Sequence, residues 1–323
     1  MILSVTIHPL LEKRLTYPRI RKGLSHRNPV EEFKPGGKGI NVCRQLNKFQ
    51  IKNLAFTFLG GNNGKIIKSL LNDEGISYTF IQTKNETRYS VIVMDEDEKN
   101  ATTFFGPDYL IADEETEEFK TKLEKMIQNC EIVVFSGSSP CKAADSIFPF
   151  GIETANKYDK ISVCDTYGNH LKDCIEKSPT VIHNNISEIE KSLNISLKTE
   201  KDKINFLNYL YSKGIKQSFL TDGKEDIYAS NFDYHYRTET IKIDEVDATG
   251  SGDAFTAGII YGLHRDKTFE DSLKLASALG ALNASSFDVC NVSPSDAEQI
   301  SNEVKIFTLG KKIKTIDVTP RTL

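Results

Sequence analysis

Signals for metal binding and membrane insertion are scarce in this chain of 323 residues. Its six cysteines form no C-x-x-C pair and its six histidines form no H-E-x-x-H, so we expect reduced, mostly buried thiols rather than a zinc site or a disulfide framework. No apolar run approaches the roughly 20 residues of a membrane span. The segment 1–5 also lacks the basic start of a signal peptide. We therefore expect a cytoplasmic protein without a membrane partner.

The charge balance is mildly acidic, with a net charge of −4 at pH 7. This argues against nucleic acid as a partner, because nucleic-acid surfaces select strongly basic proteins. The length is sufficient for a large buried core and allows one large domain or two smaller ones. The composition is typical of a soluble enzyme that acts on small molecules.

Short apolar runs alternate with segments of helical periodicity. Repetition of strand and then helix predicts an α/β fold, in which a mostly parallel sheet is covered by helices on both faces. Ligands of such a sheet bind beyond the C-terminal ends of its strands. The predicted strands are 54–59, 132–135, 161–164, 180–182 and 218–221, and the predicted helices are 65–71, 115–127, 204–210, 255–263 and 273–282.

Two segments depart from this alternation. Residues 11–34 are basic and extended in character, and residues 89–94 and 102–105 alternate around a charged turn. These segments are typical of strands in a small antiparallel sheet. An ordinary surface hairpin explains the same pattern on its own.

A glycine-rich turn, D-A-T-G-S-G-D-A-F, occupies residues 247–255 and leads into a predicted helix. Helix starts carry unpaired N–H groups and the positive end of the helix dipole, so they favour bound phosphate. Asp253 would stand beside such a phosphate and could accept the proton of an attacking hydroxyl. The alternative is a well-capped helix without a catalytic role.

A second glycine-rich turn lies far upstream, at residues 35–39, and also leads into a helical pattern. It is not a Walker A loop, because Glu32 and Gly39 stand where that motif needs a glycine and a Ser or Thr. Neither turn satisfies G-x-G-x-x-G, which argues against a dinucleotide site at either turn. Two separate glycine turns predict one turn for each of two ligands.

Together the two motifs, G-G-K-G-I-N-V at 36–42 and D-A-T-G-S-G-D-A-F at 247–255, resemble the signatures of the phosphofructokinase-B (ribokinase-like) sugar kinases. The opening residues 1–9 resemble the branch of 1-phosphofructokinases and tagatose-6-phosphate kinases. Residues 87–88, 135–140 and 185–188 follow in the family's order. The resemblance covers nearly the whole chain. It implies a single ribokinase-like kinase domain over 1–323, with a β lid from about 11–34 and 88–105 that closes over the sugar and helps to form a homodimer.

The resemblance also implies a role for individual residues. Asp253 resembles the catalytic base. Arg88 matches the position for the phosphate that the sugar already carries, since a guanidinium fork can pair phosphate oxygens bidentately. Glu188 would act on Mg²⁺ indirectly, through water. The other implied sets are the anion hole (Gly250, Ser251 and Gly252), the sugar site (Glu12, Gly36, Gly37, Lys38, Asn41 and Ser139) and the ATP site (Asn185, Thr221 and Gly223).

Three positions depart from the family pattern. His8 replaces an asparagine, Glu12 replaces an aspartate that binds sugar hydroxyls, and His183 replaces a lysine near the ATP phosphates. We expect an ATP- and Mg²⁺-dependent kinase for a phosphorylated ketohexose, with fructose 1-phosphate giving fructose 1,6-bisphosphate. The alternatives are a kinase for tagatose 6-phosphate or for another sugar or nucleoside, and a sugar-phosphate-binding protein with weak catalysis.

Overall fold

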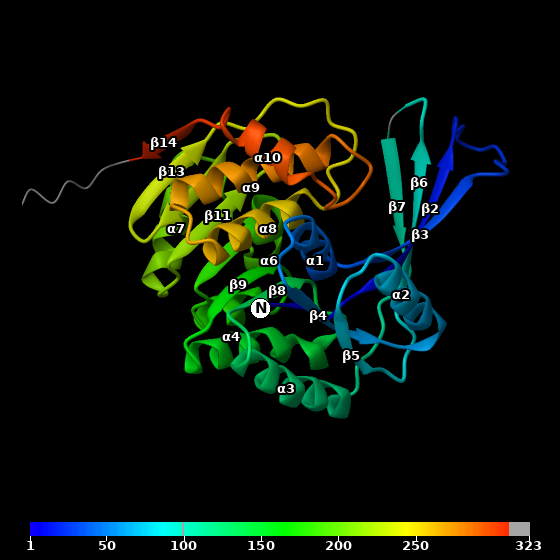
Figure 1. Cartoon of the computed structure of the whole chain (residues 1–323), viewed down its shortest axis with the longest axis horizontal. Helices are drawn as coiled ribbons and strands as arrows, with labels where there is room; N and C mark the ends of the chain where they lie inside the picture. Colours follow the sequence, from blue (N-terminus) through cyan, green and yellow to red (C-terminus); the bar gives the residue numbers. More distant parts are fainter. Residues whose placement is uncertain (99, 310–323) are drawn as a thin grey trace, which may run out of the picture.

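The computed structural model describes residues 1–98 and 100–309, which form a large sheet and a small one (Figure 1). The large sheet is parallel from β5 to β11, and β12, β13 and β14 extend it by antiparallel pairing. In spatial order its strands are β14 (Ile306–Leu309), β13 (Tyr234–Thr238), β12 (Ile227–Asn231), β11 (Gln217–Thr221), β10 (Val181–Asn185), β9 (Ile161–Thr166), β8 (Ile132–Gly137), β1 (Ile2–Thr6), β4 (Asn53–Leu59) and β5 (Tyr78–Gln82).

Helices cover both faces of the large sheet (Figure 1). One face packs against α1 (Lys38–Lys48), α8 (Ser251–His264), α9 (Phe269–Ala284) and α10 (Pro294–Ser301). The opposite face packs against α3 (Asp113–Gln128), α4 (Ile147–Lys157), α5 (Leu171–Glu176), α6 (Ile186–Leu193) and α7 (Glu200–Ser212). The helix α2 (Gly61–Asp73) packs with α1 and β4 in a third cluster.

Burial on both faces explains the sequence of the central strands. Every residue of β8 is buried, which accounts for its continuous apolar run. In β1, Ile2 contributes to the core below α1 and α8, whereas Leu3 and Val5 contribute to the core on the other face. These strands therefore hold their C-terminal ends rigidly in place.

The small sheet contains β3 (Val30–Gly36), β2 (Leu10–Tyr17), β6 (Tyr89–Asp95) and β7 (Asn100–Phe105), in that order. It stands beside the helical body in Figure 1. The pairs β2–β3 and β6–β7 are antiparallel, and a parallel β2–β6 pair joins the two hairpins. One row across the sheet is Lys34, Glu12, Ser90 and Phe105, so these side chains share one face.

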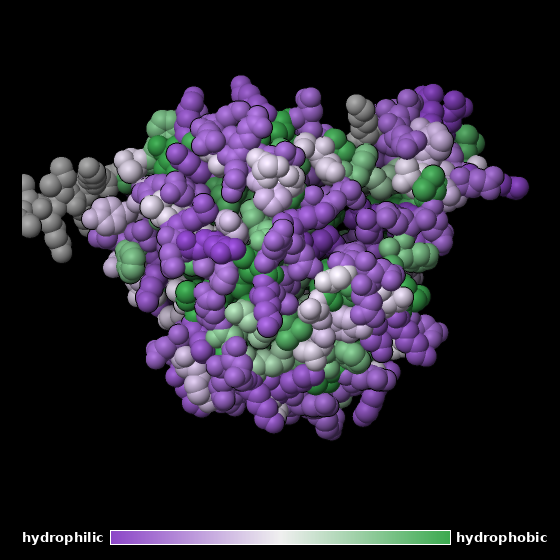
Figure 2. All heavy atoms as spheres, in the orientation of Figure 1, coloured by the Kyte–Doolittle hydropathy of each residue, from purple (hydrophilic) through white to green (hydrophobic). Residues whose placement is uncertain are grey.

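The fold predicted from the sequence is confirmed. Each predicted strand and helix overlaps an observed one, and the sheet is parallel in its centre. None of the helices within the described residues is both long and apolar enough to cross a membrane. The face drawn in Figure 2 is mostly hydrophilic, with hydrophobic side chains scattered among charged ones.

Candidate active site

Both glycine turns open into one cavity of about 1230 Å³ at the C-terminal ends of the parallel strands. Its lining includes the last residues of four strands: Thr6 of β1, Gly137 of β8, Asn185 of β10 and Thr221 of β11. The start of α8 and one face of the small sheet complete the wall. This is the position that ligands take in open α/β sheets.

The turn before α8 requires glycine at one position. Gly250 is the N-cap residue and has a left-handed φ of 79°. A Cβ atom on Gly250 would lie 2.2 Å from Cγ1 of Val289, so another residue would be both strained and obstructed. Gly252 lies in the first helical turn without a positive φ, and a Cβ there would meet only Cε1 of His183 at 3.3 Å. The backbone requirement of the motif therefore lies at Gly250.

The first amides of α8 face the cavity side of this turn. The Ser251 N–H donates to the Ala248 carbonyl at 3.1 Å. The first intrahelical bond runs from the Ala254 N–H to the Gly250 carbonyl at 2.9 Å. The N–H groups of Gly252 and Asp253 precede that bond and have no partner within the part of the chain that the structure describes. Of the predicted anion hole, Ser251 is thus already engaged, and the Asp253 amide joins the available donors.

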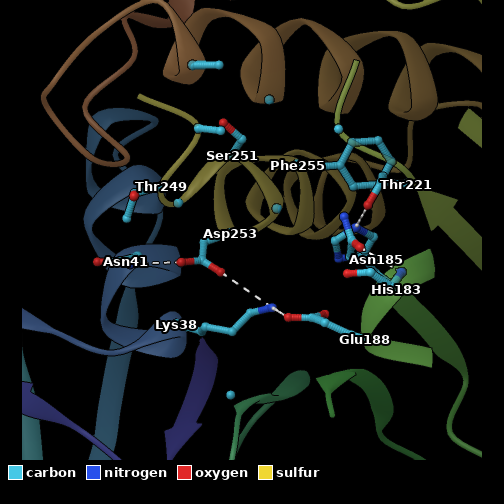
Figure 3. A pocket seen from close by; sticks show the side chains of 18 of the residues that line it. Lys38, Asn41, His183, Asn185, Glu188, Thr221, Thr249, Ser251, Asp253 and Phe255 are labelled. Carbon is cyan, nitrogen blue, oxygen red and sulfur yellow. Dashed lines mark hydrogen bonds and ion pairs between the residues drawn. The ribbon is translucent and has the colours of Figure 1, made fainter. Parts of the chain in front are cut away.

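The side chain of Asp253 projects into the cavity beside these amides (Figure 3). The residue is 4% exposed. Its Oδ2 accepts a hydrogen bond from Nδ2 of Asn41 at 2.8 Å, and its Oδ1 lies 3.9 Å from Nζ of Lys38. Burial raises the pKa of Asp253 to about 7, although Lys38 opposes the shift. A carboxylate with a pKa near neutrality is well suited to accept a proton.

The side chain of Lys38 lines the cavity, and its ammonium group lies between the carboxylates of Asp253 and Glu188 (Figure 3) and next to a third, that of Asp165. Its Nζ is 2.9 Å from Asp165, 3.8 Å from Glu188 and 3.9 Å from Asp253. Burial alone would lower the pKa of Lys38, but the carboxylates raise it above its usual range. Lys38 therefore carries a fixed positive charge where the two glycine turns meet.

Asp165 is a member of the site that sequence reasoning missed. It is fully buried near the end of β9, and its Oδ1 pairs with Lys38. Burial would raise the pKa of Asp165, but Lys38 and His183 lower it, so the carboxylate is ionised. Its position at the C-terminal end of a predicted parallel strand was the available signal.

The departure at His183 is accommodated by a buried hydrogen-bond network. The ring stacks on Phe255 with a centroid distance of 4.9 Å. Its Nδ1 lies 2.9 Å from the Thr256 hydroxyl, and its Nε2 lies 3.1 Å from the Thr221 hydroxyl. His183 thus packs into the wall of the cavity, and Lys38 supplies a positive charge there.

Arg88 and His8 form the far end of the cavity, below the small sheet. The Arg88 side chain is 13% exposed, and its Nη2 donates to the His8 carbonyl at 3.2 Å. Oδ1 of Asp108 lies 3.4 Å from Nη1 of Arg88 and 3.1 Å from Nε2 of His8. Burial lowers the pKa of His8 to about 3, so its ring is neutral. An exposed carboxylate thus lies beside the two side chains that line this end of the cavity.

The serine turn at this end presents a different hydroxyl from the predicted one. Ser139 is absent from the cavity lining, and its Oγ donates to the Cys141 carbonyl at 2.9 Å. Ser138 lines the cavity instead, and its Oγ lies 2.8 Å from Nδ1 of His8. The tight turn that follows Gly137 turns the second serine away from the cavity. Of the two serines, only Ser138 therefore faces the cavity.

The first glycine turn packs directly against the small sheet. A Cβ on Gly36 would lie 2.6 Å from Oε1 of Glu12, and Gly37 has a left-handed φ of 134°. Glu12 lines the cavity, while its Oε2 accepts a bond from Nη2 of Arg14 at 3.0 Å. The glycines thus let the carboxylate of Glu12 lie against the turn, with Oε1 nearest to Gly36.

The opposite end of the cavity is lined by Asn185, Glu188, Thr221 and Gly223. Asn185 is the N-cap of α6, and its Oδ1 accepts from the Ser187 N–H at 2.9 Å. That bond leaves the Asn185 amide nitrogen for a ligand. Glu188 lies in the first turn of α6, with its carboxylate 3.8 Å from Nζ of Lys38.

The donor set at this end fits a magnesium ion that is bound mainly by phosphate and water. Mg²⁺ in phosphoryl-transfer sites keeps several waters and takes only one or two carboxylates from the protein. Glu188 supplies one carboxylate on the cavity wall at this end, as such a site requires. The residues that the structure describes contain no cluster of three or more His, Cys, Asp or Glu side chains that could hold a metal alone.

Comparison with known proteins agrees with this geometry. Residues 12–296 match the family described as pfkB family carbohydrate kinase. Tagatose-6-phosphate kinase from Staphylococcus epidermidis is 29% identical over 311 residues, which cover 95% of this chain and 99% of that protein.

Solved structures share the fold at lower identity. A possible 1-phosphofructokinase from Thermotoga maritima has a TM-score of 0.87 at 21% identity, covering 96% of this chain and 99% of that one. Phosphofructokinase-2 from Escherichia coli, in a tetrameric inhibited form, has a TM-score of 0.84 at 20% identity, covering 94% of this chain and 98% of that one.

Proposed function

We propose that this chain, which belongs to the pfkB family of carbohydrate kinases, transfers the γ-phosphate of ATP to the free terminal hydroxyl of a phosphorylated ketohexose. Fructose 1-phosphate is the first acceptor to test, with fructose 1,6-bisphosphate as the product. Tagatose 6-phosphate is the second, because the relative from S. epidermidis at 29% identity is a tagatose-6-phosphate kinase.

The observation that carries this proposal is that one cavity contains two separate groups that can bind phosphate. A partly buried arginine, Arg88, lines the cavity below the small sheet, and the amides that begin α8 line it together with the carboxylate of Asp253. A guanidinium suits a phosphate that stays on the sugar, whereas helix-terminal amides suit the phosphate that is transferred. Two anion sites around one base are what a kinase for a phosphorylated acceptor needs.

The chain's own groups can then perform the transfer. The acceptor hydroxyl attacks the γ-phosphorus in line and Asp253 accepts its proton, while the bond from that phosphorus to the bridging oxygen breaks and ADP leaves. The amides of Gly252 and Asp253 hold the charge that develops on the transferred group. Lys38 places a positive charge beside the same group. Bound Mg²⁺, held near Glu188 through water, would neutralise part of the phosphate charge.

The direct test is an ATP-turnover assay with a panel of acceptors: fructose 1-phosphate, tagatose 6-phosphate, fructose 6-phosphate, free fructose and a nucleoside. We expect the highest kcat/KM for one of the phosphorylated ketohexoses. A wild-type preference for a free sugar or nucleoside would overturn the acceptor class. Binding of sugar phosphates without turnover of any acceptor would support a binding protein instead.

The role of Glu188 is open to a metal titration. Glu188→Gln replaces a carboxylate near the ion's water shell by a neutral amide, so about tenfold more Mg²⁺ should be needed for half-maximal rate. The measurement is initial rate against free Mg²⁺ at saturating ATP. Glu190→Gln, on the same helix, is the matched control and should leave the requirement unchanged. An unchanged requirement in Glu188→Gln would mean that the residue is only part of the α6 surface.

We also propose that the small sheet acts as a lid over the acceptor and pairs with the same sheet of a second copy. The supporting observation is the row Phe33, Lys13, Val91 and Phe104, which crosses all four strands on the face opposite the cavity. Phe33 and Phe104 are exposed, at 36% and 58%. An apolar stripe on a single-layer sheet favours a protein partner.

The dimer is tested by sedimentation velocity. The wild type should sediment as a dimer at micromolar concentration, and Phe104→Lys should shift it toward monomer because a charge would be buried at the contact. Phe232→Lys, another exposed phenylalanine but on the large sheet side, is the control. A monomeric wild type, or a Phe104→Lys variant that remains dimeric, would contradict this arrangement.

A further inference from the structure

The carboxylate of Asp253 is held by a side-chain amide that is itself held by an arginine. Nδ2 of Asn41 donates to Oδ2 of Asp253 at 2.8 Å (Figure 3). Oδ1 of the same amide accepts from Nη1 of Arg44 at 2.7 Å. Asn41 and Arg44 are three residues apart on α1, so they lie on one side of the helix.

The guanidinium of Arg44 is anchored from two other elements. Its Nε donates to Oε2 of Glu74 at 2.6 Å, and its Nη2 donates to Oε1 of Glu74 at 3.2 Å. Glu74 is the C-cap residue of α2. The Nη2 group also donates to the Pro35 carbonyl at 2.9 Å, at the end of β3 where the first glycine turn begins. These contacts leave Nη1 pointing at Asn41 in a fixed direction.

A fixed donor next to an asparagine determines which way its amide is turned. An amide can present either its oxygen or its nitrogen to a neighbour, whereas an arginine can only donate. The amide oxygen of Asn41 must therefore face Arg44, and the amide nitrogen must face Asp253. Without Arg44, the amide oxygen would lose its anchor, so the amide could rotate away and no longer hold the carboxylate of Asp253 in one position.

We propose that Arg44 is a positioning residue for the catalytic step. It fixes the amide of Asn41, and through that amide it fixes the carboxylate of Asp253 beside the amides of α8. Through Pro35 it also ties this alignment to the glycine turn on the acceptor side. This inference rests on the proposed kinase function, since it assigns a role in the transfer step.

The test is a double-mutant cycle on kcat. Removal of Arg44 alone would leave Glu74 without its partner, so the variant Arg44→Met/Glu74→Leu replaces the ion pair by two apolar side chains, which better preserves folding. With the best acceptor of the panel, we expect kcat to fall by about 10- to 100-fold, because a misplaced base slows transfer, while KM for ATP changes little. In an Asn41→Ala background, the same pair of substitutions should cause no further loss.

Two further measurements separate this role from general stability. Glu74→Gln keeps one acceptor oxygen for Arg44 and leaves the bond from Arg44 to Asn41 in place, so it should retain nearly the wild-type kcat. A crystal structure of Arg44→Met/Glu74→Leu tests the same point without an activity assay. It should show that the 2.8 Å hydrogen bond between Asn41 and Asp253 is broken because one of the two side chains has moved.

An unchanged kcat, or an equal loss with and without Asn41, would overturn the positioning role while leaving the kinase proposal intact. A crystal structure with the Asn41 and Asp253 side chains unmoved would overturn it as well. Failure of the wild type on every acceptor would instead contradict the proposed function, and the structural measurement would still decide whether Arg44 holds the pair.

Discussion

Asp253→Asn should lower kcat by about 10²–10⁴-fold, the usual effect of removing a positioned base. The asparagine side chain has the same shape but cannot accept the hydroxyl proton as a carboxylate does. Binding of ATP should change little, because the amides of α8 are part of the backbone and remain in place. The measurement is kcat and KM for both substrates, together with the Kd for ATP by calorimetry.

The pH profile gives an independent check of the same residue. Because burial raises the pKa of Asp253 to about 7, the base is ionised above that pH and protonated below it. The kcat/KM of the wild type should therefore fall about tenfold per pH unit below pH 7. Residual activity of Asp253→Asn should lack this acidic limb. Asp247→Asn, a carboxylate that caps the preceding turn, is the control and should retain it. A variant of Asp253 with most of its turnover would exclude it as the base.

Local patterns predicted the parallel centre of the fold because those strands are buried on both faces. The run at 132–135 is apolar without interruption, and in the structure all of β8 is buried. The antiparallel strands β12, β13 and β14 were missed because they mix polar and apolar residues, as β13 (Tyr234–Thr238) does. Their order in the sheet depends on antiparallel pairing between neighbours, which short-range periodicity does not specify.

The candidate site was predictable where one short motif contains both the special backbone turn and the reactive side chain, as with Gly250 and Asp253. It was not predictable where the contact joins distant segments. Asp165 meets Lys38 across 127 positions of sequence, and only the sheet order brings them to 2.9 Å. Asn283 is a second example, because its Nδ2 donates to the Thr249 carbonyl at 2.8 Å and so supports the turn before α8. The position of Asp165 after a predicted strand was the one local signal for it, and no local pattern marks Asn283.

Arg88→Ala should weaken transition-state binding of a phosphorylated acceptor by about 2–4 kcal/mol, which is roughly a 30- to 900-fold loss in kcat/KM. Nε of Arg88 is buried without a hydrogen-bond partner among the described residues, and Nη1 has only the exposed Asp108 at 3.4 Å. The guanidinium thus has donors to offer to a dianion. An unphosphorylated sugar carries no such charge, so its kcat/KM should change little. The measurement is kcat/KM for fructose 1-phosphate, tagatose 6-phosphate and free fructose.

The carboxylate of Asp108 makes this prediction sharper, because it lies 3.4 Å from the guanidinium that is expected to bind the phosphate. Asp108→Asn removes a competing negative charge next to Arg88 and His8, so it should lower KM for the phosphorylated acceptor where Arg88→Ala raises it. Arg265→Ala removes a surface arginine at the far end of α8 and controls for net charge. Equal losses on phosphorylated and free sugars in Arg88→Ala would mean that Arg88 supports the small sheet. Opposite effects of Arg88→Ala and Asp108→Asn, confined to phosphorylated acceptors, are expected only if a phosphate binds between them.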